Sequence, residues 1–170
     1  MKHDRRIVIV GFMGCGKTTV STALARRLGC KMIDLDSLIT KSEGRSPAEI
    51  IQQDGEEAFR AIERRALQNA LKNNEAGVIA LGGGAWTIEA NRALIAQHNC
   101  LTVWLDAPFD LCWRRIISSG HTIRPLAPDR ESTRSLYKSR RRQYALVQLR
   151  LAIGEGDSAE GLAQQILTQT

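Results

Sequence analysis

The fold of this chain is decided by one stretch near its start, Ile7-Val8-Ile9-Val10-Gly11-Phe12-Met13-Gly14-Cys15-Gly16-Lys17-Thr18. Its first four residues are apolar and β-branched, which is typical of a strand buried on both faces of a parallel sheet. Its last eight match the pattern GxxxxGK(S/T), a P-loop, which requires a strand before it and a helix after it. Apolar residues recur at four-residue spacing over residues 17–28, so a helix is predicted there and both conditions are met.

The P-loop predicts a binding site for the phosphates of ATP. Its glycines let backbone N–H groups converge on phosphate oxygens, and the N-terminus of the following helix adds partial positive charge. Lys17 is expected to bridge the β- and γ-phosphates, and Thr18 is expected to bind Mg2+ through its hydroxyl. The residues of this segment that we expect to bind ATP are Gly14, Cys15, Gly16, Lys17, Thr18 and Thr19.

Beyond the P-loop, predicted strands alternate with predicted helices. Strands are expected at residues 7–10, 32–36, 78–81, 101–105 and 149–153. Helices are expected at residues 17–28, 46–55, 58–73, 88–97, 108–118, 130–148 and 158–167. This alternation predicts an α/β fold with helices on both faces of a parallel sheet, and a ligand beyond the carboxyl ends of the strands. With 170 residues, no internal repeat and no linker, the chain is expected to form one domain, residues 1–170.

Composition and charge favour a globular protein with an anionic ligand. Hydrophobic residues make up 43% of the chain and charged residues 25%, which is far from the signature of disorder. The net charge of +6 is compatible with nucleic acid or with an anionic small substrate. The arginines cluster at residues 60–65 and 124–142 with few aromatic residues between them, which argues against a stacking platform for single strands. We therefore expect no nucleic-acid partner.

The cysteines and the apolar segments bear on location. Four widely spaced cysteines without a CxxC pair or a histidine cluster predict neither a zinc site nor a disulfide framework. No stretch approaches the roughly 20 apolar residues of a membrane span. The apolar run before Gly11 is too short for a signal peptide. We expect a cytoplasmic monomer with reduced thiols and no membrane contact.

Two carboxylates follow the second predicted strand. Asp34 and Asp36 are two residues apart, so on a strand both side chains point the same way at its carboxyl end. Helix N-caps or turn residues are the alternative interpretation. The third predicted strand ends in Gly82-Gly83-Gly84 and offers no Walker B aspartate, which makes Asp34 the natural candidate to hold Mg2+ through water. Asp36 could then accept or orient the attacking hydroxyl.

Other charged residues have competing interpretations. Asp106 superficially resembles a Walker B residue, but it precedes Ala-Pro, and we favour a helix N-cap. Arg60 and Glu63 are three residues apart on a helix, which by default is an exposed ion pair. Arg124 lies in a proline-flanked loop and could close over the phosphates during transfer. The arginine run at residues 140–142 is most often a solvated face, and at most one or two of its members can point into one pocket.

The order of these motifs resembles that of the shikimate kinases, over about residues 7–144. The motifs are the P-loop, Asp34-Leu35-Asp36, Gly55-Glu56-Glu57-Ala58-Phe59-Arg60 with Glu63, Gly82-Gly83-Gly84, Arg124-Pro125-Leu126, and Arg140 four residues before Tyr144. The resemblance implies a three-layer α/β sandwich like that of nucleoside monophosphate kinases, with a central five-stranded parallel sheet in the order 2-3-1-4-5. It also implies substrate-binding helices at about residues 34–73 and a mobile lid at about residues 119–129.

The resemblance further implies a reaction and a role for each motif. The γ-phosphoryl group of ATP would pass to the 3-hydroxyl of shikimate, a small anionic hydroxy acid on the route to chorismate and the aromatic amino acids. Asp36 would hold and polarise the ring hydroxyl, and Arg60 and Arg140 would bind the carboxylate, with Glu63 orienting Arg60. Arg124 would be the lid arginine. The turn that would approach the substrate with backbone N–H groups is Gly82, Gly83 and Gly84.

Two other functions remain open from the sequence. One is a kinase of the same fold that acts on a different hydroxy acid such as gluconate. The other is a P-loop module that binds nucleotide or nucleic acid without catalysis, which the net charge of +6 suggests. A kinase should release ADP only when its acceptor is present, so acceptor-dependent turnover separates these classes.

Overall fold

The computed structural model describes residues 5–119 and 129–169. In the described part of the chain, five parallel strands form one sheet in the order β2-β3-β1-β4-β5, which confirms the predicted order 2-3-1-4-5. The strands are β1 (Ile7–Val10), β2 (Lys31–Asp34), β3 (Ala76–Ala80), β4 (Leu101–Asp106) and β5 (Leu149–Ala152). The helices are α1 (Lys17–Leu28), α2 (Leu35–Glu43), α3 (Pro47–Asp54), α4 (Glu56–Lys72), the 3-10 helix η1 (Ala85–Thr87), α5 (Glu89–Gln97), α6 (Phe109–Ser118), α7 (Arg130–Tyr144) and α8 (Ala159–Thr168).

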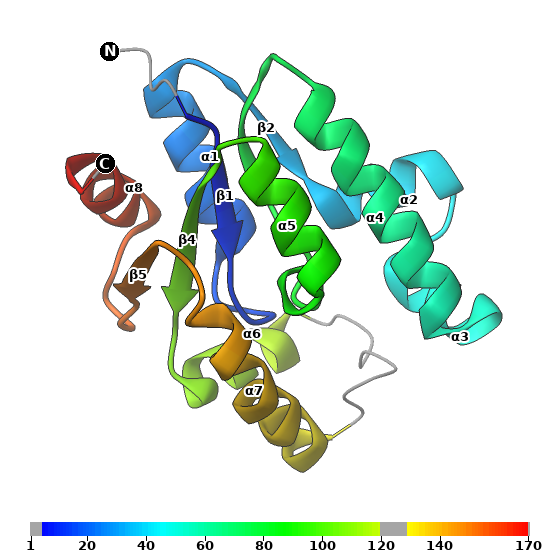
Figure 1. Ribbon diagram of the computed structural model, residues 1–170. Helices are drawn as coiled ribbons and strands as arrows, with labels where there is room; N and C mark the ends of the chain where they lie inside the picture. Colours follow the sequence, from blue (N-terminus) through cyan, green and yellow to red (C-terminus); the bar gives the residue numbers. More distant parts are fainter. Residues whose placement is uncertain (1–4, 120–128, 170) are drawn as a thin grey trace.

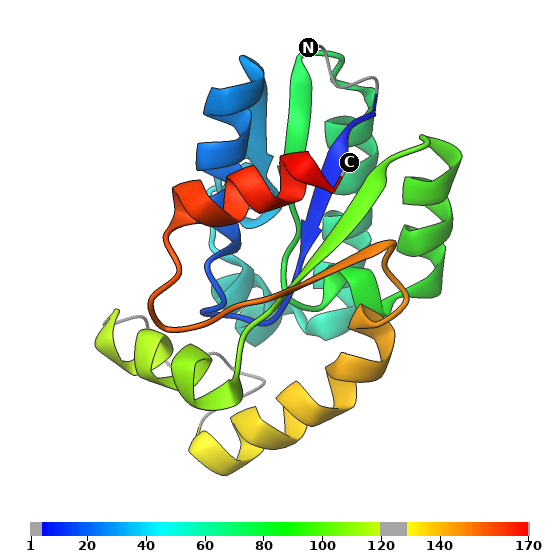
Figure 2. The ribbon, with the colours of Figure 1, turned by 90° about the vertical axis from the view of Figure 1, so that its left-hand side faces the viewer.

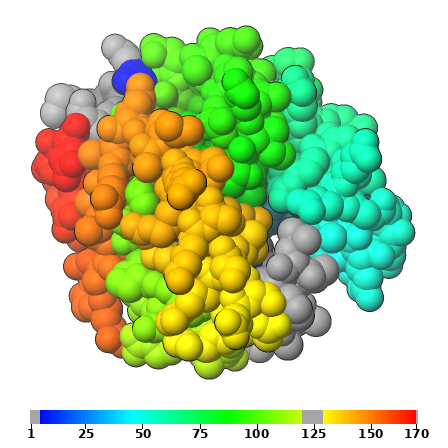
Figure 3. Space-filling model, turned by 60° about the horizontal axis from the view of Figure 1, so that its bottom comes forward, coloured from blue at the N-terminus to red at the C-terminus, as the bar shows by residue number. Residues whose placement is uncertain are grey.

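Helices cover both faces of the sheet, as predicted. Helices α1 and α8 pack together on one face, and α4 and α5 lie on the other (Figures 1 and 2). Helices α6 and α7 lie at the end of the sheet toward which the strand arrows of β1 and β4 point (Figure 1). With this end brought forward, the α2–α3 segment lies at the right edge and α7 lies in the middle and lower part of the view (Figure 3).

Strand β1 is the centre of the core. Each of its four residues is at most 1% exposed, because β3 and β4 flank it and helices cover both faces. Burial of four branched aliphatic side chains stabilises the fold by about 1.5–3 kcal/mol each. The strand thereby fixes the start of the P-loop, which follows it directly.

The helix boundaries follow local signals in most places. Ser46 caps α3 with a capping box: its side chain accepts from the backbone N–H of Glu49, and the Glu49 carboxylate accepts from the backbone N–H of Ser46 at 2.6 Å. Gly29 ends α1 in the left-handed conformation with a φ of 64°, as its position in the sequence predicts. Helix α7 ends at Tyr144, four residues before the predicted boundary.

The second strand differs from its predicted extent. It ends at Asp34, and α2 begins at Leu35, inside the range of about 34–73 in which the resemblance implied helices but where the residue pattern alone indicated a strand. Asp34 is the N-cap of this helix and accepts a hydrogen bond from the backbone N–H of Ser37 at 3.0 Å. Leu35 and Ile39, one helical turn apart, are fully buried. The prediction that Asp34 and Asp36 share a strand was therefore wrong, because capping and burial of a helical face decide this segment.

Candidate active site

The P-loop joins β1 to α1 at the carboxyl edge of the sheet. Gly14 and Gly16 have φ values of 76° and 96°, in the left-handed region that favours glycine. A methyl group on Gly14 would also lie 2.7 Å from the carbonyl oxygen of Cys112 on α6. These two glycines are therefore required for the conformation in which the loop meets the N-terminus of α1.

Lys17 and Thr18 extend from the start of α1. The Lys17 ammonium donates to the carbonyl oxygens of Gly11 and Phe12 at 2.8 and 3.0 Å, so it lies across the loop. The Thr18 hydroxyl donates to Oδ2 of Asp34 at 2.6 Å. The structure thus brings together the two residues predicted to hold Mg2+, although Asp34 is also a helix N-cap. Thr19 is exposed on the next position of α1.

Cys15 lies inside the loop, two residues before Lys17. Its side chain is 1% exposed, and burial raises the pKa of its thiol above the ordinary value, despite the opposing effect of Lys17. A thiol with a raised pKa and no solvent access is a weak nucleophile. Cys15 therefore serves as a small buried residue of the loop.

The triple-glycine turn follows β3 and is where three predicted acceptor residues meet. A methyl group on Gly82 would lie 2.7 Å from Oδ1 of Asp36, which belongs to the first turn of α2. The same addition to Gly83 would lie 3.1 Å from Nη1 of Arg140. Each of these side chains occupies space that a Cβ atom would otherwise fill.

The third glycine completes the arrangement. A methyl group on Gly84 would lie 2.8 Å from Nη1 of Arg60 on α4. The turn also borders the P-loop, because the backbone nitrogen of Met13 would be 3.7 Å from a methyl group on Gly83. Residues from α2, α4 and α7 therefore converge on one turn beside the phosphate-binding loop, as the resemblance implied.

Glu63 is buried and Arg60 is partly buried, so the default interpretation of their spacing as an exposed ion pair was wrong. Glu63 is 1% exposed and accepts from Nη1 of Arg60 at 2.7 Å. The reason is tertiary: this face of α4 packs against the glycine turn, where a methyl group on Gly82 would lie 3.2 Å from Oε1 of Glu63. Burial raises the pKa of the Glu63 carboxyl, Arg60 partly opposes this effect, and the charge of Asp36 adds to it.

The three consecutive arginines of α7 point in different directions. Arg140 is 8% exposed and faces the glycine turn. Arg141 contacts Asp106, and Arg142 is exposed. The prediction that these residues cannot share one pocket is confirmed, and the solvated-face interpretation holds for Arg142 alone.

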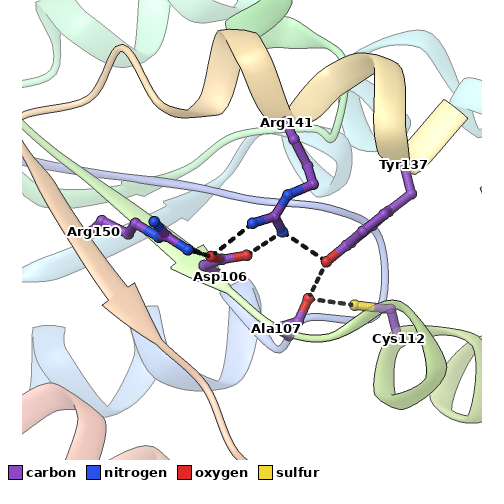
Figure 4. Close-up of polar contacts among 6 residues, drawn as sticks. All are labelled: Asp106, Ala107, Cys112, Tyr137, Arg141 and Arg150. Carbon is purple, nitrogen blue, oxygen red and sulfur yellow. Dashed lines mark hydrogen bonds and ion pairs between the residues drawn. The ribbon is translucent and has the colours of Figure 1, made fainter.

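Asp106 is the last residue of β4, and the predicted N-cap role was wrong. The N-cap position of α6 is Pro108, and no side-chain hydrogen bond is made there. Instead the Asp106 carboxylate accepts from Nη2 of Arg141 at 3.1 Å and from Nε of Arg150 at 2.8 Å (Figure 4). Both guanidinium groups also lie about 5 Å from the ring of Trp104, at 4.9 and 5.0 Å. The carboxylate faces cations from α7 and β5, which are distant in sequence, so a local pattern could not reveal this role.

A hollow of about 680 Å³ lies beside α6. Arg115, which lines it, donates to the carbonyl oxygen of Gly14 at 3.3 Å. Its other lining residues are Leu111, Arg114, Ile117, Ser118 and Glu155. Sequence reasoning did not identify Arg115. Arg115 is about a hundred residues from the P-loop along the chain, so no local sequence pattern indicates their contact.

Arg124 and nearly all of the expected lid at 119–129 lie outside the described residues, which exclude 120–128. Among residues 5–119 and 129–169, no helix has the length and apolar character needed to cross a membrane. All four cysteines are free thiols in the structure.

Comparisons with known proteins agree with this arrangement. A family model described as shikimate kinase matches residues 13–170. A shikimate kinase of Streptomyces avermitilis is 40% identical over 164 residues, which cover 95% of this chain and 93% of that protein. A shikimate kinase of Cereibacter sphaeroides is 39% identical over 155 residues, which cover 89% of this chain and 76% of that protein.

A solved structure gives the same result. The shikimate kinase from Acinetobacter baumannii in complex with shikimate superposes with a TM-score of 0.87 at 30% identity, covering 99% of this chain and 93% of that one. The family match extends over nearly the whole chain and agrees with the sequence relatives and with the fold. This chain therefore belongs to the shikimate kinase family.

Proposed function

We propose that this shikimate kinase transfers the γ-phosphoryl group of ATP to the 3-hydroxyl of shikimate in the space between the P-loop and the triple-glycine turn. The observation that carries the proposal is the convergence of Asp36, Arg60 and Arg140 on that turn, next to the backbone of Met13 in the P-loop. One carboxylate and two guanidinium groups match an acceptor that carries both a reactive hydroxyl and a carboxylate.

The nucleotide phosphates occupy the P-loop. Backbone N–H groups between Gly14 and Thr18 bind phosphate oxygens at the N-terminus of α1. Lys17 exchanges the carbonyl oxygens of Gly11 and Phe12 for the β- and γ-phosphates, which attract an ammonium group more strongly than neutral carbonyls do. The hollow beside α6 accommodates the rest of the nucleotide, because Arg115 links its wall to the carbonyl of Gly14.

Mg2+ fits the oxygen atoms present beside the loop. The Thr18 hydroxyl and the Asp34 carboxylate lie 2.6 Å apart, and Mg2+ binds through one or two such groups together with waters and substrate phosphates. When bound, Mg2+ neutralises charge on the transferring phosphates.

The acceptor carboxylate is bound by Arg60 and Arg140. Guanidinium groups pair with carboxylates through two parallel hydrogen bonds, which fix orientation as well as position. Glu63 holds one side of Arg60 at 2.7 Å and so limits the directions in which its remaining N–H groups point. Backbone N–H groups of the turn, which carries no side chains, approach the ring.

Asp36 acts on the reacting hydroxyl. Its carboxylate accepts a hydrogen bond from the 3-hydroxyl and takes up the proton as the new oxygen–phosphorus bond forms and the bond to the ADP oxygen breaks. Arg124 as a lid residue, the cytoplasmic location and the monomeric state stay predictions.

The experiment that tests this assignment is a coupled ADP assay over a panel of hydroxy acids. Turnover should depend on shikimate, and the absence of shikimate-dependent turnover at millimolar acceptor would overturn the assignment.

The role of Asp36 is tested by substitution. Asp36→Asn should lower kcat by about 10²–10⁴-fold and leave ATP binding intact, because the amide has the size of the carboxylate but cannot accept the proton of the hydroxyl. Asp54→Asn on the exposed end of α3 is the matched control and should keep the original kcat. An unchanged kcat in Asp36→Asn would refute the role of Asp36.

A further inference from the structure

Tyr144 carries a buried hydroxyl that bonds to the triple-glycine turn. It is the last residue of α7 and is 1% exposed. Its hydroxyl donates to the carbonyl oxygen of Gly83 at 2.5 Å. Burial raises the pKa of its phenol above the ordinary value, so the group keeps its proton and remains a donor.

The Arg140 guanidinium lies beside the same hydroxyl. The two side chains are one helical turn apart on the same face of α7. Both approach one glycine: a methyl group on Gly83 would lie 3.1 Å from Nη1 of Arg140 and 3.8 Å from the Tyr144 hydroxyl. The phenol donates its proton to the Gly83 carbonyl. Because arginine can only donate, the phenol oxygen is left as an acceptor for the guanidinium beside it.

The bond to Gly83 fixes the orientation of a peptide group. Because the peptide unit is planar and trans, the N–H of Gly84 points opposite to the C=O of Gly83. Glycine has no side chain to restrict rotation of this peptide, so an external hydrogen bond is what selects one orientation. Tyr144 therefore sets the direction of the guanidinium and of one N–H in the glycine turn together.

The backbone of α7 is held by a separate contact. The indole N–H of Trp86, in η1, donates to the carbonyl oxygen of Gln143 at 2.8 Å. The Tyr144 ring additionally packs against Trp104, with ring centroids 5.9 Å apart. Removing the hydroxyl alone therefore leaves the helix end and the ring packing in place.

We propose that the Tyr144 hydroxyl is a positioning group for the acceptor, which couples Arg140 to the Gly83–Gly84 peptide so that both present hydrogen-bond donors in fixed directions. This inference rests on the proposed binding of the acceptor carboxylate by Arg140. It assigns a function to a residue that does not itself need to touch the substrate.

The test is Tyr144→Phe, with KM measured separately for shikimate and for ATP. Loss of a buried hydrogen bond at a binding group should raise the shikimate KM about tenfold, with the ATP KM changed less than about twofold. Tyr137→Phe is the matched control, because Tyr137 also lies on α7 and its hydroxyl also donates to a backbone carbonyl, that of Ala107 at 2.9 Å. The control should keep its shikimate KM within about twofold, although it loses a comparable hydrogen bond.

A double-substitution cycle separates this inference from the function on which it rests. Arg140→Ala should raise the shikimate KM by itself, and an unchanged KM there would refute the proposed role of Arg140. Tyr144→Phe should then raise the shikimate KM by a smaller factor in the Arg140→Ala background than in the original protein. The reason is that part of the effect of Tyr144 passes through Arg140. Fully additive effects, or equal changes in the shikimate and ATP KM values of Tyr144→Phe, would overturn the positioning role.

Stability must be measured on the same variants. The midpoint of thermal unfolding should fall by a similar amount in Tyr144→Phe and Tyr137→Phe, since each loses one hydroxyl-to-carbonyl bond. If Tyr144→Phe fails to fold while Tyr137→Phe folds, the hydroxyl is structural and the proposal is wrong. Equal folding with a KM change confined to Tyr144→Phe supports it.

Discussion

Replacing Gly84 by alanine is the most informative single change in the acceptor site. The φ and ψ values of Gly84, −99° and −14°, are accessible to alanine, so the backbone is not strained. The added methyl group would lie 2.8 Å from Nη1 and 2.9 Å from Cζ of Arg60. The perturbation therefore acts on one guanidinium group.

The magnitude follows from what holds Arg60 in place. Its guanidinium is bonded to Glu63 at 2.7 Å and to Glu56 at 3.2 Å, and it lies 5.2 Å from the ring centroid of Phe59. To relieve the contact, the group must move and weaken its bond to the buried Glu63. A hydrogen bond between charged groups contributes about 1.5–3 kcal/mol. Because each 1.4 kcal/mol is a factor of ten, kcat/KM for shikimate should fall about 10- to 150-fold.

Steady-state kinetics with both substrates measure this effect. The loss should appear mainly in the shikimate KM, with the ATP KM nearly unchanged. Gly83→Ala is an internal comparison with a smaller expected loss, because its methyl group would lie 3.1 Å from Nη1 of Arg140 and needs only a small adjustment. Gly156→Ala, where a methyl group would meet nothing within 4 Å, is the control. A shikimate KM unchanged in Gly84→Ala, or an equal rise in the ATP KM, would refute the reasoning.

Two further predictions concern buried carboxylates. Because burial raises the pKa of Glu63, its ionisation costs more in the folded protein than in the unfolded chain. The free energy of unfolding of the original protein, relative to that of Glu63→Gln, should therefore be highest below the ordinary carboxyl pKa. It should fall as pH rises through the raised pKa of Glu63. Urea unfolding across this pH range measures the difference. A relative stability that increases with pH would contradict this sign. Removing Arg141 or Arg150 alone should cost about 1 kcal/mol, since each is partly exposed and Asp106 keeps the other partner. The double substitution should lower the free energy of unfolding by about 3–5 kcal/mol, because the buried Asp106 carboxylate then loses both arginines. If chemical denaturation shows that the two single losses simply add, the two arginines do not share Asp106 as proposed.

Much of the fold could be predicted because its determinants are local. The apolar run at residues 7–10, the P-loop pattern and the capping box of α3 each specify a conformation within a few residues. Alternation of strands and helices then restricts the topology to a parallel sheet. The residue pattern alone did not predict helix α2, because Asp34-Leu35-Asp36 alternates like a strand, whereas Asp34 is in fact an N-cap.

The residues of the site that the resemblance named could be predicted. The surroundings of charged residues could not be predicted where burial by distant parts of the chain determines them. Glu63 looks like a surface partner of Arg60 in a helical pattern, and only the packing of α4 against the glycine turn makes it buried. Asp106 likewise looks like a helix cap until Arg141 and Arg150 are placed beside it. Both errors came from the same cause, since a charged residue's environment depends on elements that are distant along the chain.

The two glycine-rich segments of this site are glycine-rich for different physical reasons. In the P-loop, Gly14 and Gly16 adopt positive φ values that other residues rarely reach, so the requirement is conformational. In the turn at residues 82–84, no glycine has a left-handed φ, and the requirement is space for Asp36, Arg60 and Arg140. Substitutions in the first segment should therefore disturb the loop and nucleotide binding. Substitutions in the second should leave the backbone intact and displace the groups that recognise the acceptor, so the two halves of the reaction can be perturbed separately.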